Sequence, residues 1–466
     1  MPEHILFLTG KLAEKSLHKV LESMHPTEFT YDVRQIGISV AGLMTSDLIR
    51  RRVTDIGPAT QLLVPGRCRG DLDALSAHYG LPVARGPEEL KDLPQFFGRA
   101  GRPVDLSRYD VLIFAEIVDA TTLDIAGILA RAQRYRDDGA DVIDLGCLPD
   151  TPFPHLEDAV RELKHRGFRV SVDSVDPTDL KRGGRAGADY LLSLKEDTLW
   201  VADEVASTPV LIPAQPGDLD SLGRSIQHMR RIGRDFLADP ILDPIHFGFT
   251  ASIVRYAEMR SRFPDVPIMM GIGNLTELTE ADTTGINALL MGIVSELRLN
   301  AILATEVSPH ARTAVREADL ARRIMFAARD ESSLPKGYDG GLTTTHERKP
   351  FPDGADEIAE IARAIKDPSY RIQVSDAGVH LYNRDGLFSA TEAFELYPHL
   401  NVDGDAGHAF YLGVELAHAQ IAWQLGKRYC QDEPLNWGVA VRRQAERLDS
   451  FKAPGTTMSH ALRMKS

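Results

Sequence analysis

The sequence has few cysteines, no long apolar run and no excess of positive charge. Its three cysteines, Cys68, Cys147 and Cys430, have the spacing of neither a disulfide framework nor a zinc site, which favours a reducing cytoplasm. No apolar run approaches the ~20 residues that span a bilayer. Residues 1–4 lack the basic region of a secretory signal. We therefore expect a cytoplasmic protein without a membrane segment.

The net charge of −14 comes without any block of lysine or arginine. Proteins that bind nucleic acid or anionic membranes carry such blocks, so neither partner is expected. A small anionic substrate is compatible with this charge, because one arginine pair or a backbone nest can hold it. The composition is otherwise that of a globular protein, and 466 residues are enough for more than one domain.

Two similar stretches are the strongest pattern in the chain. Residues 139–146 read GADVIDLG and residues 168–174 read FRVSVDS, so each short apolar run ends in a carboxylate, Asp144 or Asp173. Continuous apolar runs are typical of parallel strands covered on both faces. A helix is predicted between them at 156–165, ending before Gly167. Together these segments predict a βαβ unit.

The same alternation of strand and helix continues over residues 110–330, close to the ~250 residues of a typical (β/α)8 barrel. Besides the two opening stretches, strands are predicted at 111–115, 190–193, 210–212, 236–238, 268–270 and 301–304. A helix is predicted at 283–298, with a buried face formed by Ile286, Leu289, Leu290, Ile293, Val294 and Leu297. We predict an α/β protein with a central closed TIM barrel, and an open sheet is the competing architecture.

Smaller domains are predicted on both sides of the barrel. Residues 1–109 have the strand and helix pattern of a small Rossmann-like α/β domain, in which the loop with Arg67 and Arg69 suits a phosphate but is more often a solvated βα loop. Residues 331–466 predict an α+β domain with helices at 355–365 and 408–427 and a hairpin of strands 371–374 and 378–382. Its histidines lack a metal-ligand pattern and are expected to be structural. The predicted domains are 1–109, 110–330 and 331–466.

Barrel active sites are built at the C-terminal ends of the strands. These ends are rich in carboxylates and amides and lack lysine. Such a rim suits a neutral heterocycle, because one carboxylate can accept two hydrogen bonds from an N–C–N edge. The alternative is that several of these side chains cap the following helices. The candidate residues are Glu116, Asp119, Asp144, Asp173, Ser193, Gln215, Asp239, Asp243, Asn274, Thr305 and Glu306.

Four segments occur in a recognisable order: GADVIDLG at 139–146, RVSVDS at 169–174, GAD at 187–189 and LADP at 237–240. This series resembles the pterin-binding barrels, which include dihydropteroate synthases and methyltetrahydrofolate–corrinoid methyltransferases. The resemblance is strongest to the dihydropteroate synthase-like proteins of tetrahydromethanopterin-using organisms. In those proteins the barrel lies between an N-terminal α/β domain and a C-terminal extension. Residues 269–278 and 408–413 also resemble that group.

The resemblance places Asp144, Asp173 and Asp239 at pterin-pocket positions. Asp243 is a rival to Asp239, because the chain has two Asp-Pro pairs in this region. Asn274 matches the asparagine that contacts pterin in the corrinoid-linked methyltransferases.

Other positions depart from the synthases. Their asparagine after strand four is replaced by Leu192 or Ser193, and their lysine-serine after strand seven is Leu275-Thr276. Their arginine and histidine after strand eight become apolar or Thr305, with Glu306 in place of an aspartate. The first loop, 116–122, lacks their proline. Pterin binding is therefore better supported than the handling of pyrophosphate.

The resemblance implies a transferase of tetrahydromethanopterin biosynthesis. It would condense 6-hydroxymethyl-7,8-dihydropterin pyrophosphate with 4-(β-D-ribofuranosyl)aminobenzene 5′-phosphate and release pyrophosphate. Asp144, Asp173 and Asn274 would be catalytic, holding the pterin and stabilising a cationic transition state. The other candidates at the strand ends would bind substrate.

Mg²⁺ is expected only as a partner of pyrophosphate, with no protein residue assigned as its ligand and no tightly bound organic cofactor. Arg312 and Arg316 are candidate phosphate ligands, because the i, i+4 spacing predicts one helical face; a solvated helix face is the alternative.

Three other functions remain open. A pterin-dependent methyltransferase acting with a corrinoid protein is favoured by Asn274, and a non-catalytic pterin-binding scaffold by the missing lysine. A barrel with no pterin role is the third. Related barrels pair through their outer helices, so a homodimer is expected by resemblance.

Overall fold

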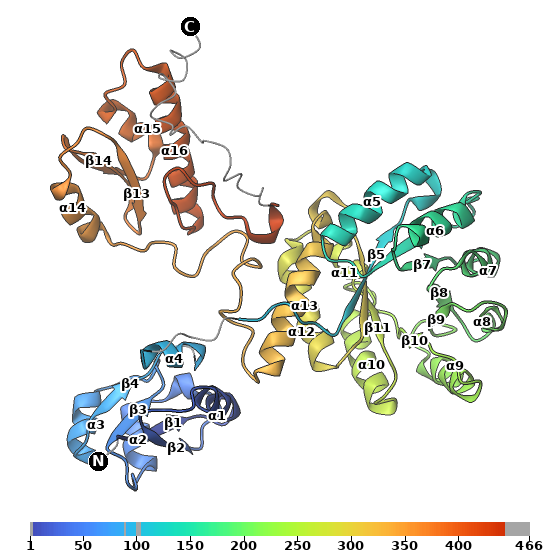
Figure 1. Ribbon diagram of the computed structural model, residues 1–466, viewed down its shortest axis with the longest axis horizontal. Helices are drawn as coiled ribbons and strands as arrows, with labels where there is room; N and C mark the ends of the chain where they lie inside the picture. The colour runs from blue at the N-terminus through green and yellow to red at the C-terminus, as the bar shows by residue number, and fades with distance from the viewer. Residues whose placement is uncertain (1–2, 88–89, 99–103, 443–466) are drawn as a thin grey trace. The chain divides into compact units, whose positions relative to one another are not determined.

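The computed structural model describes residues 3–87, 90–98 and 104–442 (Figure 1). They form three separate β-sheets of four, eight and three strands. One sheet falls inside each predicted domain, and the boundaries of those domains stay a prediction. By its internal contacts the chain divides into two compact units, one of Met1–Ile272, Leu289–Leu303 and Ala321–Asp339, the other of Gly273–Ala288, Ala304–Leu320 and Gly340–Ser466. No helix within the described residues combines the length and apolar character needed to cross a membrane.

The N-terminal sheet is parallel, with strand order β2-β1-β3-β4, as a small α/β domain requires. Side chains alternate between the faces of a strand. Ile5 and Phe7 of β1 therefore pack into one buried cluster, while Leu6 and Leu8 pack into another. The elements are β1 (His4–Thr9), α1 (Glu14–Ser23), β2 (Thr30–Gln35), α2 (Ser46–Arg52), β3 (Gln61–Val64), α3 (Leu72–Tyr79), β4 (Val83–Arg85) and α4 (Leu93–Phe96).

The central sheet is a parallel, nearly closed barrel with strand order β10-β9-β8-β7-β6-β5-β12-β11. A bridge between Ala238 and Ile268 joins its two ends, so the barrel prediction is confirmed over the open sheet. The strands are β5 (Leu112–Ile117), β6 (Val142–Gly146), β7 (Val170–Asp173), β8 (Tyr190–Leu194), β9 (Thr208–Leu211), β10 (Leu237–Ala238), β11 (Met269–Gly271) and β12 (Ala301–Thr305).

Helices α5 to α10 lie outside the strands (Figure 1). Several are capped by aspartates in the loops before them: Asp124, Asp176 and Asp218 accept hydrogen bonds from backbone N–H groups of the first turn. The helices are α5 (Ile125–Asp137), α6 (Leu156–His165), α7 (Pro177–Ala186), α8 (Val201–Glu204), α9 (Leu219–Arg231), α10 (Phe249–Arg262), α11 (Gly273–Thr276), α12 (Thr283–Glu296) and α13 (Ala314–Asp330).

Two details of the predicted helices are wrong. Leu289 of α12 is 64% exposed, although its spacing predicted a buried face; Leu290, Met291 and Val294 are the buried apolar side chains of that helix. Arg312 is not helical with Arg316, because a short 3-10 turn ends at Ala311 and α13 begins only at Ala314.

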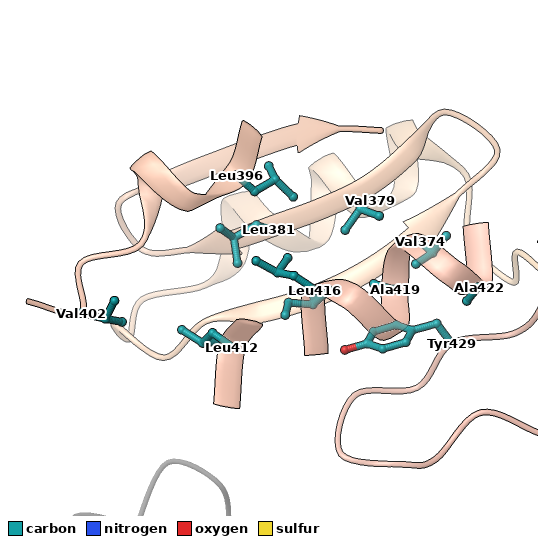
Figure 2. Packing of buried hydrophobic residues seen from close by; sticks show 11 residues of the cluster. Val374, Val379, Leu381, Leu396, Val402, Leu412, Leu416, Ala419, Ala422 and Tyr429 are labelled. Carbon is teal, nitrogen blue, oxygen red and sulfur yellow. The ribbon is translucent and has the colours of Figure 1, made fainter. Parts of the chain in front are cut away.

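The C-terminal sheet is antiparallel, with order β13-β14-β15. The predicted hairpin is present, but the third strand was missed. Figure 2 shows Leu412, Leu416 and Ala419 of the long helix α16 packed against Val379 and Leu381 of the sheet. The elements are α14 (Ala355–Ala364), β13 (Arg371–Ser375), β14 (Gly378–Asn383), β15 (Gly386–Ala390), α15 (Ala393–Leu396) and α16 (Ala406–Leu425).

His380 is buried in this sheet. Both of its ring nitrogens lie 2.7 Å from serine hydroxyls, those of Ser375 and Ser389. These contacts satisfy both ring nitrogens of His380.

Candidate functional site

Three acidic side chains converge at the C-terminal ends of neighbouring barrel strands. Glu116 lies on β5, Asp144 on β6 and Asp173 at the end of β7, and one carboxylate oxygen of each lies within 4.8 Å of the others. The strand register explains this meeting, because Glu116 pairs with Asp144 and Gly146 pairs with Asp173. We call these three residues the acidic trio.

An apolar layer lies beneath the acidic trio. Phe114 and Val142 precede Glu116 and Asp144 by two residues, so they occupy the same face of their strands. They belong to a buried cluster with Tyr190, Leu192 and side chains from four further strands. We call this apolar layer the dry floor. It disfavours the charged form of the carboxylates that lie above it.

Burial raises the pKa of every member of the trio. It raises the pKa of Glu116 to about 7. Burial, followed by repulsion from Glu116 and Asp239, raises the pKa of Asp173 to about 8. The pKa of Asp144 lies well above its usual range because of burial and of repulsion from Asp173 and Glu116, against a hydrogen bond from Ser171 that lowers it. At neutral pH this cluster holds protons that exposed carboxylates would have lost.

Asp239, directly after β10, is the fourth acid of this region. Its Oδ1 accepts hydrogen bonds from the Tyr256 hydroxyl at 2.6 Å and from the N–H of Ile241 at 2.7 Å. Burial raises its pKa to about 6, while the hydrogen bond from Tyr256 acts in the opposite direction. Its charge reaches Asp173, since it contributes to the raised pKa of that residue.

The rival acid Asp243 has a different environment. Its Oδ2 accepts a hydrogen bond from Arg255 at 2.7 Å, within an ion pair. Arg255 also donates to the carbonyl oxygens of Pro240 and Ile241. Ile241 has a φ of +68°, a strained value for a β-branched residue. Arg255 thus holds the loop between the two Asp-Pro pairs, and the Asp243 carboxylate is engaged in the ion pair with Arg255.

Asp119, Ser193 and Gln215 are the remaining candidates from the first strands. Asp119 is paired with Arg131 at 3.3 Å, and its side chain is half-exposed. Ser193 lies within β8 at an irregularity of its pairing with β9, and Gln215 is exposed in the loop after β9.

The later candidates belong to the second compact unit. Asn274 lies in the short helix α11 directly after β11, and Thr305 is the last residue of β12. Glu306 is buried and accepts a hydrogen bond from the N–H of Val315 at 3.2 Å, which is the helix-capping role weighed above. Arg312 is exposed and donates to the Pro309 carbonyl oxygen at 3.1 Å, and Arg316 is half-buried in α13.

Sequence reasoning missed three contributors to the site. The Ser171 hydroxyl donates to Asp144, and its position two residues before Asp173 on the same strand face was a usable signal. A Cβ on Gly146 would lie 2.7 Å from Glu116 Oε1, so glycine makes room for that carboxylate. Tyr256 comes from the interior of α10, and no local pattern marks it.

The trio has the chemistry of a site for a hard cation. Within the described part of the chain, none of its carboxylates forms an ion pair with lysine, arginine or histidine. Oxygen ligands of this kind suit Mg²⁺ or Ca²⁺. Cys147 lies beside the trio, but burial and the neighbouring aspartates raise its pKa to about 12, so it is not a thiolate nucleophile.

Comparison with known sequences finds distant relatives. A model described as a family of unknown function, DUF6513, matches residues 3–88. The uncharacterized protein MJ0107 of Methanocaldococcus jannaschii is 26% identical, over 92% of this chain and 98% of that protein.

Solved structures similar to this chain include dihydropteroate synthases. The enzyme of Yersinia pestis is 19% identical over 48% of this chain and 95% of its own, with a TM-score of 0.37. That of Coxiella burnetii, solved in complex with pteroic acid, is 18% identical over 47% and 94%, with a TM-score of 0.38. That of Vibrio fischeri is 13% identical over 48% and 95%, with a TM-score of 0.39. These identities are too low to transfer a function.

Proposed function

We propose that this chain is a pterin-binding transferase of the dihydropteroate synthase type. The observation that carries the proposal is the convergence of Glu116, Asp144 and Asp173 on a dry floor, with Asp239 beside them. Pterin offers a flat ring with an edge of N–H donors, and one carboxylate can accept two of them. Asp144, Asp173 and Asp239 occur in segments that resemble the pterin-binding barrels, which makes pterin the preferred donor-rich ring.

The proposed reaction joins 6-hydroxymethyl-7,8-dihydropterin pyrophosphate to 4-(β-D-ribofuranosyl)aminobenzene 5′-phosphate. The bond from the methylene carbon to the pyrophosphate oxygen breaks, the amine nitrogen bonds to that carbon, and the amine loses a proton. Positive charge develops on the pterin as pyrophosphate leaves. Buried carboxylates stabilise such charge strongly, because no water screens them.

Separate roles follow for the acids. Asp239 is the natural anion of the set, because the Tyr256 hydroxyl and the Ile241 N–H stabilise its charged form. Asp173 is repelled by both Glu116 and Asp239, and it is proposed to bind the pterin together with Asp239. Asn274 joins the proposal through the sequence pattern, as a pterin ligand.

Mg²⁺ is proposed to accompany the reaction. The donor set fits it, because the trio offers only oxygen ligands and includes a buried Asp144 oxygen with no hydrogen-bond partner. When bound, Mg²⁺ neutralises charge on a leaving pyrophosphate.

The test is a two-part assay with the full chain. Calorimetric titration with 7,8-dihydropterin measures binding, and release of pyrophosphate from the pterin pyrophosphate plus the ribosylated arylamine phosphate measures turnover. Binding and turnover both support the proposal, and the absence of dihydropterin binding overturns it.

Two other functions are kept, each for a specific observation. Binding without turnover fits a pterin-binding scaffold, which the buried Leu275-Thr276 pair favours, because the synthases have lysine there. Methyl transfer from a methylated tetrahydropterin to a corrinoid protein fits a pterin-dependent methyltransferase, which Asn274 favours.

A further inference from the structure

We propose that Glu116, Asp144 and Asp173 hold a hard divalent cation, such as Mg²⁺, on the protein before any substrate binds. Only the purpose of that cation, the neutralisation of pyrophosphate, rests on the proposed function. The inference that the site exists rests on the structure of the trio. A cation bound there before substrate is distinct from one that enters the site together with pyrophosphate.

The first argument is charge. One oxygen of each carboxylate lies within 4.8 Å of the others, close enough for a single ion to contact all three. In the described residues no positive side chain forms an ion pair with any of them. Buried charges of one sign are costly unless protons or a cation offset them. A divalent cation neutralises these negative charges, and the carboxylates remain available to bind it.

The second argument is an oxygen that lacks a partner. Asp144 is fully buried, and its Oδ1 accepts the hydrogen bond of Ser171. Its Oδ2 is buried and has no hydrogen-bond partner, although Asp144 lies in a cluster with two other acids. Buried polar oxygens are almost always satisfied in folded proteins. A bound cation satisfies this oxygen, and Ser171 keeps the carboxylate from rotating.

The third argument is the space made for Glu116. A Cβ at Gly146 would lie 2.7 Å from Glu116 Oε1 and 3.0 Å from the backbone of Val118. Any larger residue at position 146 would displace the glutamate from the trio. Glycine therefore leaves room beside β6 for the Glu116 carboxylate, which lies within 4.8 Å of the two aspartates as a shared metal ligand must.

The donor set indicates the kind of cation. Three carboxylates are hard oxygen ligands, which suit Mg²⁺, Mn²⁺ or Ca²⁺ rather than the soft metals. No histidine belongs to the trio, and the neighbouring thiol of Cys147 stays protonated because its pKa is raised to about 12. Zn²⁺ and Cu⁺ are therefore not the expected occupants.

The experiment uses the full chain, stripped of metal and free of substrate. Mn²⁺ serves as the probe, and its bound fraction is followed by electron paramagnetic resonance. We expect one Mn²⁺ per chain, displaced competitively by Mg²⁺. Glu116→Gln and Asp144→Asn should each weaken Mn²⁺ binding by about tenfold or more, since even second-shell losses cost that much.

The controls are Asp119→Asn and Asp243→Asn, which remove nearby acids that are already paired with arginines. They should leave Mn²⁺ affinity unchanged. Far-UV circular dichroism identifies any variant that fails to fold. Should one of the trio variants fail, the other, together with the Mn²⁺ stoichiometry of the unaltered chain, decides the question.

Two results would overturn the inference: no stoichiometric Mn²⁺ at millimolar concentration, or equal affinity in the trio variants and the controls. Dihydropterin affinity measured in excess chelator tests the proposed function separately from the cation site. The unaltered chain, deprived of its cation in this way, should still bind dihydropterin. Failure to bind pterin would overturn the proposed function alone.

Discussion

Tyr256 donates its hydroxyl to Oδ1 of Asp239 at 2.6 Å, joining the interior of α10 to the residue directly after β10. Tyr256 is fully buried, so its hydroxyl is not exposed to bulk solvent. The bond leaves the second oxygen of Asp239 for other partners. It also lowers the pKa of Asp239 against the effect of burial, because a hydrogen bond to the charged form favours ionisation.

Replacing Tyr256 by phenylalanine should therefore weaken dihydropterin binding about tenfold, or ~1.4 kcal/mol. Without the donor the pKa of Asp239 should rise above about 6, so the pH at which binding is half-maximal should move upward as well. Titration calorimetry between pH 5 and 9 measures both, with the buried Tyr429→Phe, whose hydroxyl donates to Glu415, as the control. An unchanged pH profile would contradict this role.

Asp173→Ala should abolish dihydropterin binding and leave the fold nearly intact. The side chain is buried beside two other acids, so removing it relieves repulsion and does not break an ion pair in the described structure. Calorimetry and thermal unfolding measure the two effects. Dihydropterin affinity equal to that of the unaltered chain would refute the prediction.

The two Asp-Pro aspartates should behave oppositely. Asp239→Asn should reduce dihydropterin affinity strongly, because an amide cannot replace an anion held by Tyr256 and the Ile241 N–H. Asp243→Asn should cost stability more than affinity, because it breaks the ion pair with Arg255. Paired measurements of affinity and of the free energy of unfolding test this, and the reverse pattern would make Asp243 the pterin ligand.

Asn274→Ala should weaken dihydropterin binding by about 1–3 kcal/mol, the usual cost of a lost buried hydrogen-bond partner. This prediction rests on the sequence pattern after β11. The same calorimetric titration measures it, with the exposed Gln215→Ala as a comparison. A loss confined to Gln215→Ala would place the ligand elsewhere.

The stability of the metal-free protein should fall as pH rises. The pKa values of Asp239, Glu116 and Asp173 are raised to about 6, 7 and 8, whereas unfolded carboxyl groups titrate near ~4. Between these values the folded chain binds more protons than the unfolded one. The stabilisation from each carboxyl group is therefore complete below pH ~4, and it is lost as the pH rises through the pKa of that group in the folded chain. Melting temperatures in chelator from pH 5 to 9 should decline, and less steeply for Asp173→Asn. A rising melting temperature would contradict the raised pKa values.

Local patterns predicted much of the fold correctly. Helix α6 has the predicted bounds, 156–165, because its apolar spacing is regular and Gly167, with φ of +75°, follows its end. The strand β15 was missed, since Gly386–Ala390 is short, starts with glycine and lies largely at intermediate exposure. Its formation depends on pairing with β14, which sequence spacing alone does not reveal.

The sequence by itself placed Glu116, Asp144 and Asp173 among eleven candidates at the strand ends, because parallel strands bring their C-terminal ends to one edge of the barrel; the convergence of these three was seen only in the structure. Only the tertiary structure decided the chemical state of those acids. Most of the dry floor comes from strands other than those of the trio, and the Tyr256 hydroxyl on Asp239 comes from α10. Desolvation and hydrogen bonding act through space, so the pKa of a carboxylate follows its surroundings and not its neighbours along the chain.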